Sequence, residues 1–332
     1  MFIKKLQKSW YSKSGLTTAL LPLSWFFCTV VELRRLLYRL KILRTTKLPV
    51  PVIVVGNITV GGTGKTPLVI EVASILKQQG YRPGIISRGY GGKAKTWPQQ
   101  VRPDGDPTMV GDEAILIARR THCPMAVGPD RVASAKALLK YTDCNIIISD
   151  DGLQHYSLAR DIEIAVIDGV RRYGNENCLP AGPLRERTSR LQHVDFKISN
   201  GVATADEFPM TYQSEKLRRA DDPSVFLDLS SLQNQTVHAV AGIGNPQRFF
   251  DQLRSNQLDI VEHAFPDHYA FEKKDLDFGE IQPIVITEKD AVKCQRFSLL
   301  NVWFQPIKAI LDEQFVQQLL VKLEKINGQK TT

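Results

Sequence analysis

The chain has 332 residues, of which 43% are hydrophobic and 23% are charged, which suits a globular protein with a large core and two domains. Five cysteines without a C-x-x-C pair predict neither a disulfide framework nor a zinc site, in keeping with a reducing cytosol: Cys28, Cys123, Cys144, Cys178 and Cys294. Residues 1–47 contain ten Lys and Arg residues and only Glu32, a net of +9, so of the overall +8 the remaining chain carries 8 − 9 = −1 and nucleic-acid binding is not expected.

Near the N-terminus, residues 14–31 form an uncharged stretch rich in apolar residues that contains Pro22. As a straight helix it would be about 27 Å long, which is marginal against a hydrocarbon core of about 30 Å. Basic residues lie on both sides of it, which a spanning helix that follows the positive-inside rule usually avoids. No small-x-small cleavage site follows, so a signal peptide is not expected.

Beyond this stretch, five leucines recur at helical spacing with basic residues largely between them: Leu33, Leu36, Leu37, Leu40 and Leu43. The pattern predicts a basic amphipathic helix, and residues 1–45 are therefore expected to form a membrane-associating segment that lies on the membrane surface. A single membrane span and a buried hydrophobic helix of a soluble domain remain alternatives.

A phosphate-binding loop is predicted next, in the stretch VPVIVVGNITVGGTGKTP, residues 50–67. Residues 51–55 form a β-branched run typical of a buried parallel strand, and residues 65–79 have helical apolar spacing. Backbone N–H groups of the loop would bind phosphates of ATP, with Lys65 reaching the outer phosphates and the Thr66 hydroxyl reaching Mg²⁺. Thr59 stands where the usual pattern has a glycine. The expected nucleotide-binding residues are Gly61, Gly62, Thr63, Gly64, Lys65 and Thr66.

Three short loops follow in which basic or acidic residues adjoin a strand or a helix start. Arg88 in SRGYGG follows a buried strand and is a plausible anion contact. Asp112 and Glu113 in VGDEA open a helix, where carboxylates often serve only as caps. Arg131 in VGPDR lies in the first turn of a helix, where a cation is unfavourable unless an anionic ligand is near.

A carboxylate pair is predicted at the end of the strand in NIIISDDGLQH, residues 145–155. Asp150 and Asp151 would lie at the carboxyl end of this strand, beside Thr66, and hold Mg²⁺. An ordinary Asp-Asp-Gly turn is the alternative. Farther on, the loop LPAGPLRE contains Arg185 and Glu186, and their spacing alone indicates only a loop.

The C-terminal part again alternates strands and helices. Residues 236–244 form a strand that enters a helix, but Gln247 stands where a dinucleotide fingerprint requires its third glycine. Residues 283–287 form a further strand before TEKD, and Asp267 and His268 lie in a loop, FPDHY. The expected fold is α/β, with a P-loop NTPase-like parallel-sheet domain (46–210), a linker (211–235) and a smaller α/β domain (236–332).

Eight motifs in this order closely resemble the tetraacyldisaccharide 4′-kinase family of lipid A biosynthesis: GNITVGGTGKTP, SRGYGG, VGDEA, VGPDR, DDGLQH, LPAGPLRE, PDHY and TEKD. The resemblance covers nearly the whole chain, and a threonine at the loop entrance is ordinary in that family. It implies a kinase at the cytoplasmic face of the bacterial inner membrane that uses ATP and Mg²⁺. The implied acceptor is the 4′-hydroxyl of a tetraacylated glucosamine disaccharide 1-phosphate, and the product is lipid IVA. No obligate protein partner is inferred.

The resemblance also implies roles for single residues. Asp112 would be the general base, with His268 as its partner across a cleft between domains, and Lys65 would assist the transfer. Glu113 would join Thr66, Asp150 and Asp151 around the metal. Four residues match further family positions or strand-end loops and are expected near the substrate: Arg88, Arg131, His155 and Glu186. Gly92 departs from the family pattern, where a basic residue is common, and this puts one phosphate contact in doubt.

A membrane-bound ATPase switch of the cell-division type is the main alternative, because it also combines GG-x-GKT with a basic amphipathic helix. Such switches carry a lysine directly before the two glycines, and Val60 occupies that position. A lipid-binding module without catalysis is a third possibility, but it leaves Lys65, Thr66 and Asp150 unexplained.

Overall fold

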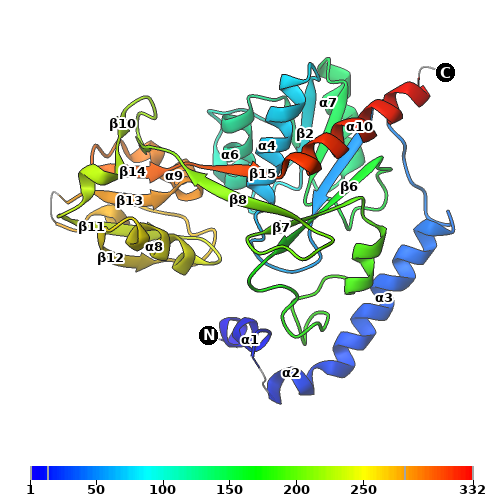
Figure 1. Ribbon diagram of the computed structural model, residues 1–332, viewed down its shortest axis with the longest axis horizontal. Helices are drawn as coiled ribbons and strands as arrows, with labels where there is room; N and C mark the ends of the chain where they lie inside the picture. The colour runs from blue at the N-terminus through cyan, green and yellow to red at the C-terminus, as the bar shows by residue number, and fades with distance from the viewer. Residues whose placement is uncertain (1, 13–14, 280–281, 331–332) are drawn as a thin grey trace. The chain divides into compact units, whose positions relative to one another are not determined.

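The computed structural model describes residues 2–12, 15–279 and 282–330 (Figure 1). The chain forms two compact units: the first comprises Met1–Arg88, Cys123–Thr211 and Ile310–Thr332, and the second comprises Gly89–His122 and Tyr212–Ala309. This division differs from the ranges expected from the sequence, since residues 89–122 join the C-terminal part and residues 310–332 return to the first unit. Lys13 and Ser14, which belong to the expected membrane-associating segment, lie outside the described residues.

The first unit is built on a parallel sheet with the strand order β8-β7-β6-β1-β5-β2-β4. Its central strands are runs of β-branched residues that are buried on both faces, as expected for a parallel sheet covered by helices. The strands are β1 (Val52–Gly56), β2 (Pro83–Ser87), β4 (Met125–Val127), β5 (Ile146–Asp150), β6 (Ile162–Asp168), β7 (Phe196–Asn200) and β8 (Phe208–Ser214).

Helices pack on this sheet through apolar residues. Helix α4 (Lys65–Gln78) packs against β1, β2 and β5, and α7 (Arg131–Tyr141) packs against β2 and β4. The C-terminal helix α10 (Glu313–Lys330) inserts Phe315 between Phe196 and Phe208, with ring centroids 5.2 and 5.8 Å away. The 3₁₀ helix η1 is Thr188–His193, and β15 (Ile307–Leu311) leads into α10. The observed order therefore confirms the expected α/β class with a parallel sheet.

The N-terminal segment forms three helices, α1 (Phe2–Ser9), α2 (Gly15–Ala19) and α3 (Leu21–Arg39). Pro22 lies in the first turn of α3, where its missing N–H costs nothing, so the uncharged stretch divides at Leu20 instead of forming one helix. Of the five leucines expected in a basic amphipathic helix, Leu33, Leu36 and Leu37 lie in the second half of α3, whereas Leu40 and Leu43 follow its last residue. The helix ends at Arg39 because Lys41 has a φ of 59° and the N–H of Ile42 bonds back to the carbonyl of Leu37.

Within the first unit, helix α3 is attached to the loop that contains Cys178. Cys28 forms a disulfide with Cys178, at a Cα–Cα distance of 6.2 Å, and the Ser24 hydroxyl donates a hydrogen bond to the Cys178 carbonyl (2.6 Å). The expectation of no disulfide is therefore wrong for this pair: the two cysteines are 150 residues apart, and sequence spacing does not reveal that the fold brings them together. The other three cysteines, Cys123, Cys144 and Cys294, are buried thiols.

The second unit contains a smaller mixed sheet with the order β10-β9-β14-β13-β11-β12. Parallel pairs join β11 (Thr236–Ala241), β12 (Asp259–Ala264), β13 (Ile284–Thr287) and β14 (Val302–Gln305), whereas β9 (Leu217–Arg219) and β10 (Phe226–Leu227) are antiparallel. Its helices are α5 (Pro107–Val110), α6 (Asp112–Thr121), α8 (Pro246–Ser255) and α9 (Glu288–Cys294), with 3₁₀ turns η2 (Leu229–Leu232), η3 (Lys273–Leu276) and η4 (Gln295–Phe297) and strand β3 (Gln99–Val101).

Candidate active site

The loop between β1 and α4 has the geometry of a phosphate-binding loop. Gly61 and Gly64 have φ angles of 108° and 98°, a region that glycine enters without steric cost, and Gly64 directly precedes Lys65, the first residue of α4. The N–H groups of the first turn of α4 have no intrahelical acceptor, so they are available to an anion. The glycines expected to bind phosphate therefore lie at the positive end of a helix.

Neighbouring loops hold this one in place. Arg171 donates to the carbonyl of Gly62 (2.7 Å), and the Asn200 amide donates to the carbonyl of Thr63 (3.0 Å). Thr59 is buried and bridges to Leu184, while the N–H of Val60 donates to the carbonyl of Pro183 (2.8 Å). The non-glycine residue at the loop entrance is thus part of a fixed junction with the loop 179–186.

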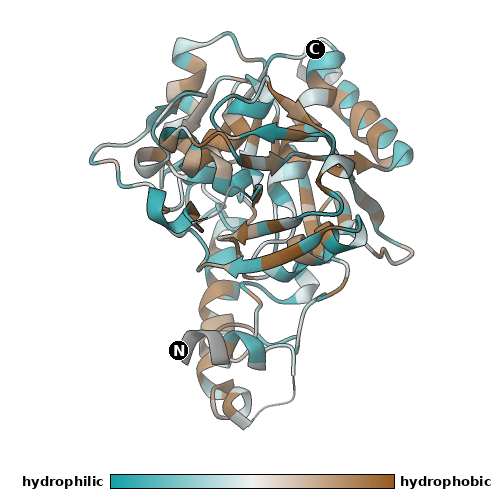
Figure 2. Cartoon of the chain, turned by 90° about the vertical axis from the view of Figure 1, so that its left-hand side faces the viewer, coloured by the Kyte–Doolittle hydropathy of each residue, from teal (hydrophilic) through white to brown (hydrophobic). Residues whose placement is uncertain are grey.

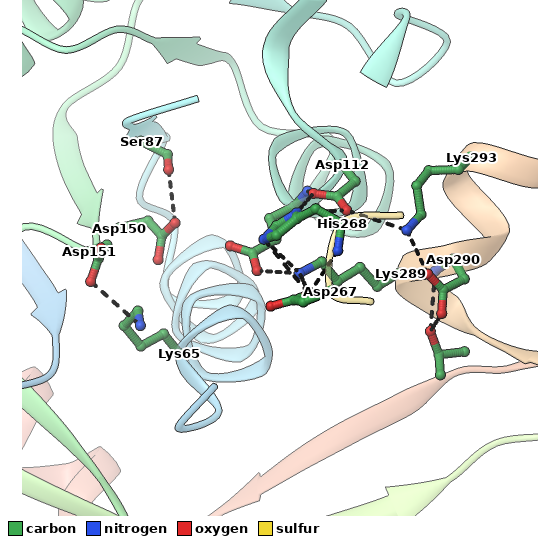
Figure 3. Close-up of polar contacts among 12 residues, drawn as sticks. Lys65, Ser87, Asp112, Asp150, Asp151, Asp267, His268, Lys289, Asp290 and Lys293 are labelled. Atoms are coloured by element: carbon green, nitrogen blue, oxygen red, sulfur yellow. Dashed lines mark hydrogen bonds and ion pairs between the residues drawn. The ribbon is translucent and has the colours of Figure 1, made fainter. Parts of the chain in front are cut away.

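The two carboxylates predicted at the end of β5 have different partners. Asp150 is buried, and one of its oxygens accepts a hydrogen bond from the Ser87 hydroxyl (2.9 Å). Asp151 lies 3.5 Å from the Lys65 ammonium and accepts a hydrogen bond from Arg185 (3.0 Å), as Figure 3 shows in part. Burial opposes ionisation of Asp151, but Lys65 and Arg185 outweigh it and hold the pKa of this carboxyl well below its usual range. It is therefore an anion at neutral pH.

Arg131 is almost completely buried at the start of α7. Its guanidinium donates to the carbonyl of Gly128 (2.7 Å) and lies 3.5 Å from the carbonyl of Asp150. Burial lowers its pKa to about 10, and burial together with Arg131 lowers the pKa of nearby His155 to about 4, so His155 is neutral at pH 7. Arg88, at the end of β2, is exposed.

Glu186 is buried in a polar network of the first unit. Gln154 and the hydroxyl of Tyr156 donate to its two carboxylate oxygens, and the guanidinium of Arg190 lies 3.6 Å from it. Burial and the neighbouring Glu186 carboxylate raise the pKa of Tyr156, which keeps the phenol protonated as a donor. These contacts orient the loop whose preceding residue, Arg185, binds Asp151.

Asp112 and His268 meet within the second unit. Asp112 is the first residue of α6, and the Nδ1 atom of His268 lies 3.2 Å from both of its carboxylate oxygens (Figure 3). His268 follows β12 with a φ of 59° and packs against Tyr90, 5.0 Å away between ring centroids. The prediction that the pair forms across two domains does not hold, because residues 89–122 belong to the same unit as His268.

The electrostatics of this pair favour an ionised carboxylate and a protonated imidazole. Burial raises the pKa of Asp112, but a hydrogen bond with His268 and the charges of Lys289 and Lys293 leave it below its usual value. The hydrogen bond with Asp112 raises the pKa of His268, while burial and Lys289 oppose that rise. A carboxylate coupled to an imidazole can accept and share a proton near neutral pH.

Lys289, in the TEKD motif, joins the remaining acidic residues of this cluster. Its ammonium lies 2.9 Å from Glu113, 3.2 Å from Asp267 and 3.4 Å from Nε2 of His268. Burial opposes the charge, but these carboxylates and Asp112 raise the pKa of Lys289. Glu113, an expected metal ligand, is therefore paired with a lysine, and it belongs to the second unit.

The sequence-predicted residues thus form two sets, one in each unit. The phosphate loop, Asp150, Asp151, Arg88, Arg131, His155 and Glu186 belong to the first unit, whereas Asp112, Glu113 and His268 belong to the second. Three residues that touch these sets had no predicted role: Arg185, Lys289 and Lys293. The adjacency of Arg185 to Glu186 and the position of Lys289 in TEKD were the available signals, and neither indicates a spatial partner.

Comparisons with known proteins agree with this geometry. The family model described as "Tetraacyldisaccharide-1-P 4′-kinase" matches residues 16–324. A tetraacyldisaccharide 4′-kinase of Nitrosococcus oceani is 53% identical over 97% of this chain and 95% of the relative. One of Methylobacillus flagellatus is 49% identical over 98% of this chain and 97% of the relative. A crystal structure of LpxK from Aquifex aeolicus in complex with ATP has a TM-score of 0.79 and 29% identity, covering 93% of this chain and 99% of that one.

A phosphate loop at a helix N-terminus, with carboxylates at the end of the neighbouring strand, defines a P-loop phosphotransferase. Coverage of nearly the whole chain by the family model and by relatives of about half identity then fixes the particular enzyme class. The chain belongs to the tetraacyldisaccharide-1-phosphate 4′-kinase family. The resemblance drawn from the eight motifs is confirmed, and the ATPase switch is not supported.

Proposed function

We propose that this chain transfers the γ-phosphoryl group of ATP to the 4′-hydroxyl of a tetraacylated glucosamine disaccharide 1-phosphate, which gives lipid IVA in lipid A biosynthesis. The observation that carries the proposal is the phosphate loop between β1 and α4, in a chain whose family acts as a kinase on this disaccharide. The relative from Aquifex aeolicus binds ATP, and the loop residues Gly61, Gly62, Thr63, Gly64, Lys65 and Thr66 would bind it here.

Oxygen ligands for Mg²⁺ are present beside this loop. Thr66 offers a hydroxyl, and Asp150 and Asp151 offer carboxylates at the end of the strand next to β1. Mg²⁺ prefers oxygen donors and is commonly held by one or two carboxylates together with substrate phosphates, so these residues fit it. When bound, the metal would neutralise charge on the phosphates. Glu113 would have to leave Lys289 before it could join this set.

Asp112 is proposed as the general base, with His268 as the group that orients it and shares its proton. A sugar hydroxyl is a weak nucleophile, and a carboxylate that accepts its proton as the bond to phosphorus forms assists the transfer. The support is the contact of His268 Nδ1 with both Asp112 oxygens, together with the low pKa of Asp112, which keeps it ionised.

The basic residues of the first unit are proposed to serve the anionic substrates. Arg88 is exposed at the end of β2 and is the one suited to touch a phosphate directly. Arg131 and His155 lie deeper and adjoin the Asp150–Asp151 turn, and Glu186 is fully engaged with Tyr156 and Gln154. Arg131, His155 and Glu186 are therefore proposed to support the residues that line the substrate side of the site, without touching the substrate themselves.

Helix α3 is proposed to lie on the cytoplasmic face of the bacterial inner membrane. Its attached face carries Cys28 into the hydrophobic core, whereas large apolar side chains elsewhere on the helix are exposed, including Trp25 (61%) and Phe26 (67%). Apolar residues recur along the helix in Figure 2, and basic residues follow in its second half. Exposed apolar patches mark interaction sites, and a basic amphipathic helix suits an anionic lipid surface. The exposure also disfavours a buried helix.

No helix among the described residues is both long enough and apolar enough to cross a membrane.

The proposed activity is tested by incubating the full chain with labelled ATP and the lipid disaccharide 1-phosphate. Label should enter the lipid at the 4′ position only when the disaccharide, ATP and Mg²⁺ are all present. A disaccharide that lacks the 4′-hydroxyl is the matched control. ATP hydrolysis that continues unchanged without the lipid, with no labelled lipid formed, would contradict the proposal.

The proposed binding of α3 to the membrane surface is tested by placing charged residues on its exposed face. Trp25→Glu combined with Phe26→Glu should lower binding to anionic phospholipid vesicles at least several-fold, because a buried apolar side chain contributes about 1.5–3 kcal/mol. Flotation of the full chain with vesicles measures this, and affinity for ATP should not change. Leu300→Glu, at a side chain that is 70% exposed in the second unit, is the control. Equal flotation of the α3 variant and the control would exclude α3 as the docking face.

A further inference from the structure

An apolar groove lies in the first unit between helix α3 and the loop that contains Cys178. Its volume is about 420 Å³, within the range of about 300–1,000 Å³ that is typical of ligand sites. The described side chains that line it come from α3 and from the loop, and all of them are apolar: Leu23, Phe26, Phe27, Val30, Leu179 and Pro180. Leu23 (55%) and Val30 (49%) are exposed, so the groove is open to the exterior. It therefore suits an apolar ligand.

The two walls of this groove are joined to one another. The disulfide of Cys28 and the hydrogen bond of Ser24 both attach α3 to Cys178, the residue that directly precedes Leu179. The carbonyl of Pro180 is held as well, because it accepts a hydrogen bond from the indole of the buried Trp10 (3.0 Å). The groove is therefore formed before a ligand arrives, and binding does not include the cost of ordering its walls.

A cation follows the groove on the same face of α3. Leu23, Phe27 and Val30 recur at positions i, i+4 and i+7 of the helix, and Arg34 continues the series at i+11. At 1.5 Å per residue, Arg34 lies about 6 Å beyond Val30 along the helix axis. Its exposed guanidinium contacts the carbonyl of Gln154 (3.4 Å) and the Tyr38 ring, and neither contact neutralises its charge. The charge is thus available to an anion at one end of the groove.

We propose that this groove holds one acyl chain of an anionic membrane phospholipid, with the phosphate of that lipid at Arg34. A phospholipid joins an apolar chain to an anionic headgroup, which matches an apolar groove that is followed by an arginine. The inference rests on the proposed binding of α3 to the membrane surface. It adds to that contact a defined site for a single lipid molecule.

The surroundings of the groove favour a membrane phospholipid over other occupants. The exposed side chains of Trp25 and Phe26 continue the apolar surface onto the face of α3 that is proposed to touch the membrane, where phospholipid chains are concentrated. None of the residues proposed to hold the nucleotide, the metal or the lipid disaccharide is among the described side chains that line the groove. An apolar protein segment would fill the groove but would leave the charge of Arg34 without an anion.

The test uses the full chain on vesicles of phosphatidylglycerol that carry a photoactivatable diazirine at the end of one acyl chain. After irradiation and proteolysis, mass spectrometry should find the lipid attached to Leu179 or Pro180, which form the wall of the groove opposite α3. A lipid that touches only the outer surface of the helix would label Trp25 and Leu36 instead, whose side chains are exposed. Label confined to Trp25 and Leu36 would overturn the inference.

Filling the groove separates this site from general membrane binding. Val30→Trp keeps α3 apolar, and it should lower the labelling of Leu179 and Pro180 by about fivefold or more, because the indole would occupy the space of the acyl chain. Flotation with the vesicles should stay within about twofold of the native chain. Leu36→Trp is the matched control, because Leu36 is similarly exposed (47%) but lies on another face of the helix, and it should change neither readout. Undiminished labelling in Val30→Trp would overturn the inference.

The headgroup contact is tested by changing the charge of Arg34. Arg34→Gln should lower the labelling of Leu179 and Pro180 several-fold, whereas Arg34→Lys should largely retain it, because the cation attracts the anionic headgroup. Arg39→Gln makes the same charge change at an exposed residue on another face of α3 and is the control. Equal losses in Arg34→Gln and Arg39→Gln would overturn the assignment of the headgroup to Arg34. Native affinity for ATP in each variant shows that the fold is intact.

Failure of the underlying membrane proposal gives a different result, since the native chain would then not float with the vesicles at all. A native chain that floats but carries no label on Leu179 or Pro180 excludes only the lipid site in the groove. The remaining occupant is tested with a lipid disaccharide 1-phosphate that carries the same diazirine on an acyl chain. If this molecule labels Leu179 and Pro180 and phosphatidylglycerol does not, the groove belongs to the substrate and the inference is overturned.

Discussion

Replacing Lys65 by alanine is expected to lower kcat by about a hundredfold or more, because the loss of a group that stabilises charge in the transition state typically costs about 3 kcal/mol. Lys65 is the first residue of α4, and its ammonium is held near the loop by Asn57 (3.2 Å) and Asp151 (3.5 Å). In the proposed mechanism this charge serves the outer phosphates of ATP. Steady-state kinetics with saturating lipid measure the loss.

The fold should survive this change, since Asp151 keeps its hydrogen bonds from Arg185 and the glycine loop keeps Arg171 and Asn200. Lys77→Ala, near the other end of the same helix, is the matched control and should leave kcat within about twofold. A Lys65→Ala enzyme with native turnover would remove the phosphate loop from the mechanism, whatever its affinity for ATP.

Asp112→Ala and His268→Ala are each expected to lower kcat by a factor of about 10² to 10⁴. The two side chains contact one another at 3.2 Å, so they should act as a unit, and the double variant should be far less damaged than the product of the two losses. Single-turnover rates of the native chain, the two single variants and the double variant give the double-mutant cycle that measures this. Multiplicative losses would mean that His268 does not assist Asp112 and has a separate, structural role.

The pH profile gives a second test of this pair. The hydrogen bond with Asp112 raises the pKa of His268, so protonation of the native pair should depress kcat as the pH falls through a value at or above about 6.5. In His268→Ala this limb should disappear, because the carboxylate that remains loses its proton at a more acidic pH than the imidazole does. His193→Ala, at an exposed histidine of the first unit, should leave the limb in place. A limb that persists in His268→Ala would assign it to another group.

Local patterns in the sequence predicted the parts of this molecule that depend on local physics. A β-branched run followed by glycines and a helix start is enough to predict the phosphate loop from the sequence. The carboxyl end of a parallel strand is likewise enough to predict where Asp150 and Asp151 lie, because both features are determined by neighbouring residues in the chain. The carboxylate at Asp112 was equally compatible with a helix cap. Only its contact with His268, 156 residues away, distinguishes it from a cap.

Long-range contacts account for what the sequence did not predict. The pairing of Cys28 with Cys178, the bond of Arg185 to Asp151 and the approach of Lys293 to Asp112 depend on the packing of distant elements. The composition of the units was missed for the same reason: residues 89–122 join the second unit, in which helix α6 packs against the distant helix α9. Nothing in the spacing of either segment indicates the other.

The attachment of α3, the helix proposed to lie on the membrane, connects it to the phosphate loop through the loop of residues 178–183. Ser24 and Cys28 both bond to Cys178, and the indole of Trp10 donates a hydrogen bond to the carbonyl of Pro180 (3.0 Å). In the same loop, the carbonyl of Pro183 accepts a hydrogen bond from Val60 of the phosphate loop. The N-terminal helix is therefore not a detachable tail. A more soluble form of the enzyme should be sought by replacing the exposed apolar side chains of α3 with polar ones. Deleting the helix would remove the contacts that hold residues 178–183, and these residues in turn bond to the phosphate loop.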